Sequence, residues 1–330
     1  MGATQTIRAG AEMFSRSHVA NVAAVRSDLK RPFRILFCGD PALIAELRAA
    51  FLRVDEGDAA SDDAASMLET LAPHRRETVA GSDIKLIVFL GRPGDEQVPL
   101  REVRHFHAPI LALIVDPQAV PTSSWASPVE GAVERMTVAS LGVEHLRPSA
   151  LPFIAEALKS IAVAVGRRYP LLREALCTAI TRDIARLALK IAAGSAIADQ
   201  VPLLGFIIGR VASAGDIVAI CAMQMNLALK IGSVHMRDPD LGSIWEMLPV
   251  IGGGLGWRAL SRELSAFVPF AGLMIKAAIA YAGTIVVGEG AAFYYRTGRH
   301  MSAAQASELY AETRRAAMDI AREMIGRFCG

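Results

Sequence analysis

The chain of 330 residues has few cysteines and no excess of charge of either sign. Its four cysteines, Cys38, Cys177, Cys221 and Cys329, lie far apart and form no CxxC pair, which indicates a reduced cytosolic chain with inert thiols. The 35 basic and 33 acidic residues nearly cancel and leave a formal net charge of +2. This balance predicts no nucleic-acid partner.

The chain also lacks the features of secreted proteins and the motifs of common hydrolases. Its first residues contain no continuous apolar stretch, so we expect no secretory signal. No GxSxG motif, no HExxH motif and no Cys–His pairing is present, which argues against the enzyme classes that these motifs define.

Apolar residues make up 52% of the chain and charged residues 21%, with a mean hydropathy of +0.34. This composition is apolar for a soluble protein but low for a transporter with many spans. The length is too great for one ordinary core. We expect an N-terminal helix over residues 1–31, an α/β domain over 32–165 and an all-α domain over 166–330.

The expected α/β domain shows apolar strands that alternate with helices. Strands are expected at 33–37, 84–90, 109–115 and, more weakly, 136–139, with helices at 42–54 and 148–165 and a short helix at 67–71. Each strong strand ends in a loop of Gly, Asp or Pro. This alternation predicts a small parallel sheet.

The loop after the first strand lacks the residues that grip phosphates. A phosphate loop of the form GxxxxGK[ST] that begins at Gly39 needs lysine at position 45 and a hydroxyl at 46. The chain has Ala45 and Glu46 there, and this carboxylate would repel a triphosphate. We therefore expect no nucleotide hydrolysis, no catalytic residue and no cofactor. Gly39, Asp40 and Asp116 remain as a vestigial loop, because Asp116 is all that is left of an NKxD motif.

Three aspartates, Asp40, Asp95 and Asp116, end strands of the expected sheet, where they could form either an acidic pocket for Mg²⁺ or the turns that follow the strands. Turn formation is preferred, and no metal is expected.

The C-terminal half contains two long apolar runs, Val211–Leu229 and Ser265–Gly288, each close to the roughly 20 residues that cross a bilayer. They lie between expected helices at 170–193 and 302–328, the latter opened by a capping box of Ser302 and Gln305. Polar residues interrupt the apolar helices at Asp216, Gln224, Asn226, Lys276 and Glu289. Structural pairing, such as Asp216 with Lys276, is the expected use, and the glycine run at 252–256 is expected to be a hinge.

Several short motifs in this half resemble a bacterial domain family of unassigned function that is found fused to, or encoded beside, Era-like GTPase domains. The matching features are Ala214-Gly215-Asp216, Gln224, the run 252–255 (GGGL), Arg258, Arg262, the run 268–272 (VPFAG) and the run 280–284 (AYAGT), within residues 183–296. The resemblance implies an association with the bacterial inner membrane. It also implies that the α/β domain is a degenerate P-loop GTPase-like domain. A phosphorelay receiver-like domain is the rival, although the strand ending at Leu90 offers no acceptor aspartate.

Three functional hypotheses follow. The first is a non-catalytic, GTPase-derived adaptor or scaffold at the cytoplasmic face of the inner membrane, with the two apolar helices as a two-span hairpin. More basic residues flank the pair than lie between its members, as expected for cytosolic ends. The second is a cytoplasmic, soluble interaction module whose helical half is a closed bundle, because several charges fall within each span. The third is a nucleotide-binding enzyme with an atypical loop. For the first two we expect a protein partner or a homo-oligomer.

Overall fold

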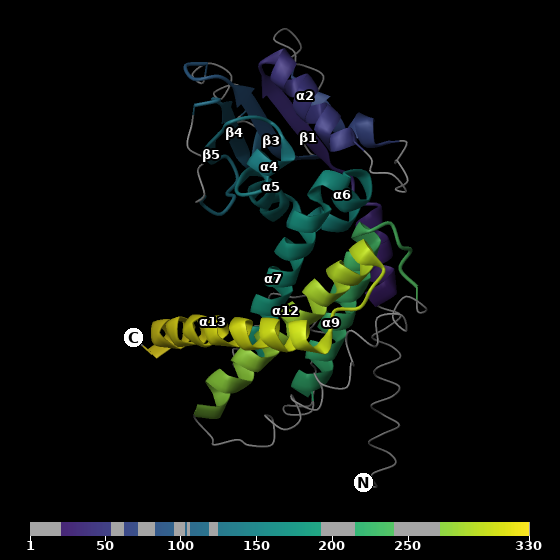
Figure 1. Cartoon of the computed structure of the whole chain (residues 1–330), viewed down its shortest axis with the longest axis vertical. Helices are drawn as coiled ribbons and strands as arrows, with labels where there is room; N and C mark the ends of the chain where they lie inside the picture. Colours follow the sequence, from purple (N-terminus) through teal and green to yellow (C-terminus); the bar gives the residue numbers. More distant parts are fainter. Residues whose placement is uncertain are drawn as a thin grey trace. The chain divides into compact units, whose positions relative to one another are not determined.

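The computed structural model describes residues 21–53, 63–71, 83–95, 103, 106–118, 125–192, 215–240 and 271–329 (Figure 1). The chain forms two compact units, one of residues 28–179 and one of residues 1–27 together with 180–330. We call them the α/β unit and the helical unit. The chain passes from the first to the second within a single helix, α7 (Arg173–Ala192).

The α/β unit is built on one sheet of five parallel strands. The strands are β1 (Arg34–Gly39), β2 (Leu68–Thr70), β3 (Ile84–Gly91), β4 (Ile110–Val115) and β5 (Val133–Val138), in the order β2-β1-β3-β4-β5. The side chains of β3 and β4 are almost all buried, as expected for strands with both faces covered. The predicted parallel α/β architecture is confirmed.

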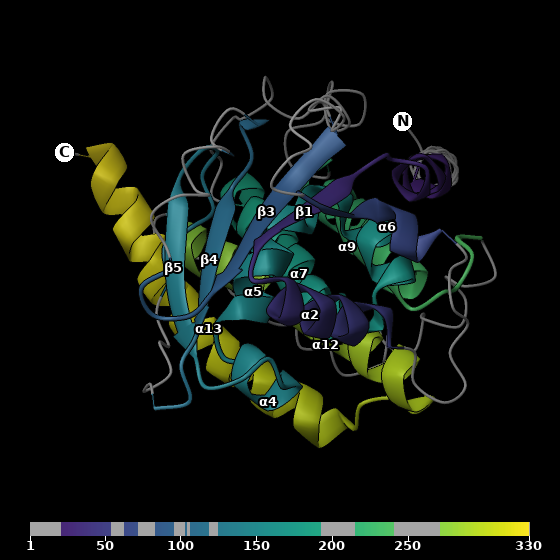
Figure 2. The same cartoon turned by 90° about the horizontal axis from the view of Figure 1, so that it is seen from above.

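Helices of this unit pack against the sheet, and Figure 2 shows α2 (Pro41–Leu52) and α5 (Ala150–Leu158) on the same side of it. Phe51 of α2 packs edge-to-face on Phe37 of β1, with ring centroids 5.9 Å apart. The helix predicted over 148–165 is divided in the structure. After the short α4 (Val143–Leu146) and α5, the chain passes through a 3₁₀ turn (Lys159–Ile161) into α6 (Ala162–Arg168) and a second 3₁₀ turn (Pro170–Leu172).

Strand β2 was not predicted, because residues 67–71 were expected to be helical. A 3₁₀ turn over Ala64–Met67 leads into this three-residue strand. Side chains from neighbouring elements hold it: Arg34 of β1 donates to Glu69, and Arg48 of α2 donates to the carbonyl oxygen of Leu68. The strand therefore depends on tertiary contacts that the local sequence does not reveal.

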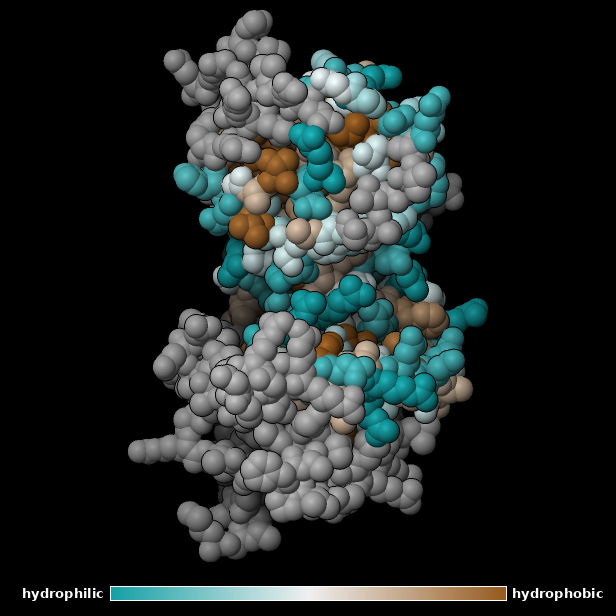
Figure 3. Space-filling model, turned by 90° about the vertical axis from the view of Figure 1, so that its left-hand side faces the viewer, coloured by the Kyte–Doolittle hydropathy of each residue, from teal (hydrophilic) through white to brown (hydrophobic). Residues whose placement is uncertain are grey.

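The helical unit contains the end of α7 together with α9 (Gly215–Val234), α12 (Ala271–Thr297) and α13 (Ala303–Cys329). The capping box predicted for α13 is present, because Ser302 N donates to Gln305 Oε1 at 3.1 Å and Gln305 N donates to Ser302 Oγ at 3.3 Å. The four helices share one core rich in alanine: Ala185, Ala188, Leu189, Ala192, Met223, Ala277, Ala278, Ala280, Tyr281, Ile285 and Ala317. Most of the described surface of this unit that is visible in Figure 3 is hydrophilic.

The expectation of two long apolar helices is corrected. Within the described residues one helical stretch, Ala277–Thr297, is long and apolar enough to cross a membrane, and 67% of its apolar window is buried inside the protein. Among the described side chains of α9 the apolar stretch is Ile220–Val234, which is shorter than the roughly 20 residues that a span requires. A core helix of a soluble protein has the same length and composition as a span, so sequence hydropathy does not separate them.

The helices α9 and α12 run in the same direction. Gln224 of α9 contacts Thr284 of α12, and further along both helices Gly232 lies against the ring of Tyr295. Figure 1 shows the same parallel course. The predicted two-span hairpin needs antiparallel neighbours, so these two helices do not form it.

Candidate functional site

Open parallel sheets bind ligands in the crevice outside the carboxyl ends of their strands, at the point where the strand order reverses. In the order β2-β1-β3-β4-β5 this point lies between β1 and β3. The loop from β1 into α2 contains Gly39 and Asp40, and the chain after β3 begins with Arg92. This place is where a phosphate or a metal-bound ligand would be expected.

Gly39 is required by the close approach of the two strands. Its φ of +113° lies in the region that favours glycine, and a Cβ at this position would lie 1.9 Å from the carbonyl oxygen of Leu90. The following amide, Asp40 N, donates to the same oxygen at 2.8 Å. The glycine of the vestigial loop therefore serves the junction of β1 with β3.

Asp40 occupies the position at the N-terminus of α2 where an anion would bind. Its carboxylate accepts from Ala42 N at 2.8 Å and from Leu43 N at 3.3 Å, while Ile44 N donates to the Asp40 carbonyl. Pro41, the first residue of the helix, has no N–H to offer. Every amide of the first turn is thus absent or already paired, and none is left for a phosphate.

The charge of Asp40 is stabilised in this position. The backbone hydrogen bonds from Ala42 and Leu43 lower its pKa, and the guanidinium of Arg92, whose Nε lies 3.5 Å from Oδ2, lowers it further. Arg92 N in turn donates to Asp95 Oδ2 at 3.0 Å. The point where the strand order reverses therefore holds the carboxylate of Asp40 and the guanidinium of Arg92.

The other residues of the predicted vestigial loop lie apart from this pair. Asp116 follows β4, which β3 separates from β1, and its Oδ1 accepts from Gln118 N at 3.0 Å in a turn. Ala45 and Glu46 are exposed on the second turn of α2. Within the described ranges no group of three His, Cys, Asp or Glu side chains could hold a metal ion.

A second polar cluster follows β5, and the sequence offered no signal for it beyond proximity in the chain. Ser140 Oγ lies 2.9 Å from His145 Nδ1, and Glu144 Oε1 lies 3.2 Å from the same nitrogen. A catalytic relay needs the carboxylate on one ring nitrogen and the nucleophile on the other. Here both groups meet Nδ1, so the geometry does not fit a serine nucleophile activated by its histidine.

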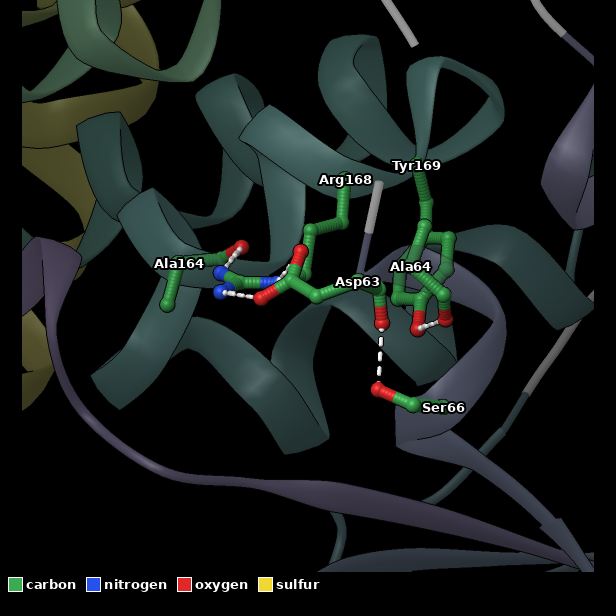
Figure 4. Close-up of polar contacts among 6 residues, drawn as sticks. All are labelled: Asp63, Ala64, Ser66, Ala164, Arg168 and Tyr169. Atoms are coloured by element: carbon green, nitrogen blue, oxygen red, sulfur yellow. Dashed lines mark hydrogen bonds and ion pairs between the residues drawn. The ribbon is translucent and has the colours of Figure 1, made fainter. Parts of the chain in front are cut away.

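A third cluster, shown in Figure 4, joins α6 to the turn before β2. Arg168 Nε donates to Asp63 Oδ1 at 3.0 Å, and Arg168 Nη1 donates to the Ala164 carbonyl. The hydroxyl of Tyr169 donates to the Ala64 carbonyl at 2.8 Å. Burial raises the pKa of Tyr169 strongly, so its hydroxyl stays a neutral donor. These contacts join α6 to the turn before β2 and stabilise the fold.

The structure describes some of the candidate residues of the helical half and leaves others outside the described set. Gln224 is buried and its Nε2 lies 3.3 Å from Thr284 Oγ1, which itself donates to the Ala280 carbonyl at 2.8 Å. Glu289 is half-buried and has an interaction partner within the chain. The backbones of Asp216 and Lys276 lie in α9 and α12, but their side chains are outside the described set, as are Arg258 and Arg262 altogether. The predicted pairing of Asp216 with Lys276 therefore stays a prediction.

The remaining polar residue of the apolar helices, Asn226, is tied to the N-terminal helix. Its Nδ2 lies 3.3 Å from Asn21 Oδ1, and Asn21 Nδ2 donates to the Ala222 carbonyl at 3.0 Å. Residues 21–29 are helical, as predicted for the N-terminal helix, whose first twenty residues lie outside the described ranges. These contacts are structural, because each amide is paired with another group of the protein.

Comparison of the chain with models of protein families, with curated proteins and with solved structures finds no match. The resemblance described for residues 183–296 accordingly stays a prediction.

Proposed function

We propose that the protein is a non-catalytic adaptor, in which the α/β unit presents a surface to a protein partner or a second copy and performs no phosphate chemistry. The observation that carries the proposal is the first turn of α2. Pro41 has no N–H, and the Asp40 carboxylate accepts hydrogen bonds from Ala42 N and Leu43 N. A negative group of the protein therefore already fills the position of a bound phosphate.

The strand order supports the receiver-like alternative for the α/β unit. The order β2-β1-β3-β4-β5 is that of flavodoxin-like folds, to which response regulators belong. Strand β3 ends at Gly91 and is followed by Arg92, so no carboxylate stands there to accept a phosphoryl group. On this interpretation the domain keeps the fold of a receiver and has lost its phosphorylation chemistry.

The packing of α12 supports a closed, water-soluble helical bundle. α12 shares its core with α7, and Gly288 of α12 lies directly against Thr181 of α7. The same stretch of α7 carries three exposed basic residues, Arg182, Arg186 and Lys190. If α12 crossed a bilayer in this packing, they would be carried into the hydrocarbon at a cost of roughly 2.5–3.5 kcal/mol each. The total of roughly 7.5–10.5 kcal/mol favours α12 as a core helix.

A membrane-attached adaptor is the second candidate. The length and hydropathy of Ala277–Thr297 favour it, since this stretch could span a bilayer if it left the bundle. Fractionation of cells that express the full-length protein tests it. We expect the protein in the supernatant or released by high salt, whereas retention in the pellet after carbonate extraction would favour the spanning form.

Calorimetric titration of the full-length protein with GTP, GDP and ATP in the presence of Mg²⁺ tests the loss of nucleotide chemistry. We expect no binding heat, with an intact GTPase as the positive control. An Asp40→Ala variant frees two amides and removes the negative charge. Micromolar binding by the unaltered protein that changes in this variant would overturn the proposal, because it would place the nucleotide at this loop.

A further inference from the structure

The outward side of α7 carries a line of basic residues. Arg182, Arg186 and Lys190 follow one another at a spacing of four residues, about one helical turn, and all three are exposed. The adjoining side of the helix is fixed in the core through Ala185, Ala188, Leu189 and Ala192. We call these three residues the α7 basic line. Because the core side cannot turn away, the line is held facing outward.

The stretch of α7 that holds this line has a net positive charge. Asp183 is the only acidic residue between positions 180 and 192, so this stretch has a formal charge of +2, which is three basic residues minus one acidic residue. The formal charges of the other 317 residues then sum to zero, since the whole chain also has a formal net charge of +2. This stretch of α7 is therefore net basic.

We propose that the α7 basic line docks the helical unit on the surface of an anionic bilayer, with the arginines contacting lipid phosphates. A guanidinium offers paired N–H donors that match phosphate oxygens. Basic side chains near an anionic leaflet are attracted to it within a Debye length. This inference goes beyond the adaptor function, because it requires neither nucleotide nor a bilayer crossing by α12. It gives a membrane-associated protein whose apolar helix stays inside the bundle.

The two arginines offer the sharper test. Asp183 and Lys190 have interaction partners within the protein, so they are left unchanged. The test variant is R182Q/R186Q, which keeps long side chains suited to a helix. The matched control is R299Q/R315Q, since Arg299 and Arg315 are also exposed and lie outside α7. Both variants lower the net charge by the same amount.

Flotation of the full-length protein with phosphatidylglycerol–phosphatidylcholine vesicles measures the partition coefficient. Each basic residue near an anionic surface changes it by roughly 5-fold, so R182Q/R186Q should bind roughly 30-fold more weakly. The control should stay within about 2-fold of the unaltered protein. Binding should fall as salt is raised and should be absent on phosphatidylcholine alone. Thermal melting confirms that both variants fold.

Three results would overturn the inference. In the first, R182Q/R186Q floats as well as the unaltered protein, or the control loses binding equally. In the second, the protein stays on vesicles in high salt and carbonate, which would mean that an apolar helix inserts. In the third, free inorganic phosphate at low concentration displaces the protein, which would mean an anion pocket and no lipid surface. The nucleotide titration is a separate measurement, so failure here leaves the adaptor proposal standing.

Discussion

The contact between α7 and α12 decides whether the long apolar helix is a core helix, and a single substitution tests it. A Cβ added at Gly288 would lie 2.3 Å from Thr181 Oγ1, 2.4 Å from Cγ2 and 2.8 Å from Cβ. Rotation of the threonine side chain cannot remove the contact with its Cβ. Gly288→Ala should therefore force the two helices apart.

The expected change in the free energy of unfolding is the difference between the gain in helix propensity and the cost of overpacking. Alanine is favoured over glycine in a helix interior by about 1 kcal/mol, whereas overpacking of a core costs about 1–3 kcal/mol. Gly288→Ala should thus lower the free energy of unfolding by up to about 2 kcal/mol. Thr181→Ala alone removes a buried hydroxyl that has no hydrogen-bond partner, and we expect a change near zero. The double variant should recover about 1 kcal/mol, because the two worst contacts disappear.

Urea unfolding followed by circular dichroism gives the free energies, and hydrogen exchange of α7 and α12 localises the effect. Gly232→Ala in α9 is the matched control. The Cβ there would meet the tip of the Tyr295 side chain at 2.9 Å, and a ring end can shift. This control should be neutral or slightly stabilising. If Gly288→Ala is as stable as the control, and its effect adds to that of Thr181→Ala within about 0.5 kcal/mol, the helices are not in contact and the reasoning fails.

Three further predictions concern the α/β unit and the pH dependence of the fold. Gly39→Ala combines a positive φ with the collision against β3 and should lower the free energy of unfolding in urea by about 2–6 kcal/mol. The control Gly94→Ala, with φ +101° and no neighbour within 4 Å, should lower it only by the backbone strain of about 1–3 kcal/mol. Equal losses in the two variants would contradict the close approach of Gly39 to β3. Tyr169→Phe removes the hydrogen bond from the buried hydroxyl to the Ala64 carbonyl and should lower the free energy of unfolding by about 0.5–1.5 kcal/mol without changing the m-value. Burial raises the pKa of the Cys38 thiol to about 12, so iodoacetamide should not modify Cys38 in the native state near neutral pH. Between the unfolded thiol pKa of about 8.5 and the folded value the native state binds more protons, so this contribution to stability should decline as pH rises, and Cys38→Ala should flatten that decline.

The sequence predicted the architecture of the sheet because buried parallel strands have a strong local signature. The run Ile84–Leu90 is almost continuously apolar and matches β3 (Ile84–Gly91) within one residue. By contrast, β2 has three residues and depends on Arg34 and Arg48 from other elements. Periodicity cannot identify a strand that is held by side chains from distant parts of the chain.

For the candidate site, the sequence could predict only that the phosphate-binding residues are missing. The sequence shows that lysine is missing at position 45, but not that Asp40 turns its carboxylate onto the amides of Ala42 and Leu43. A carboxylate at the end of a strand is equally compatible with a turn, a cap or a metal ligand. In the helical half, hydropathy alone could not reveal that α9 and α12 run parallel, because the relative direction of two helices depends on the chain that joins them.

The proline that opens α2 also bears on how this chain could change in evolution. Replacing Asp40 by a small neutral residue would uncover two amides and no more, because Pro41 has none to add. A useful anion site would need a second replacement at Pro41 and a new cation nearby, while the first step alone removes a helix cap that contributes about 1 kcal/mol. The path from this loop to an anion site therefore passes through an intermediate that has lost its helix cap.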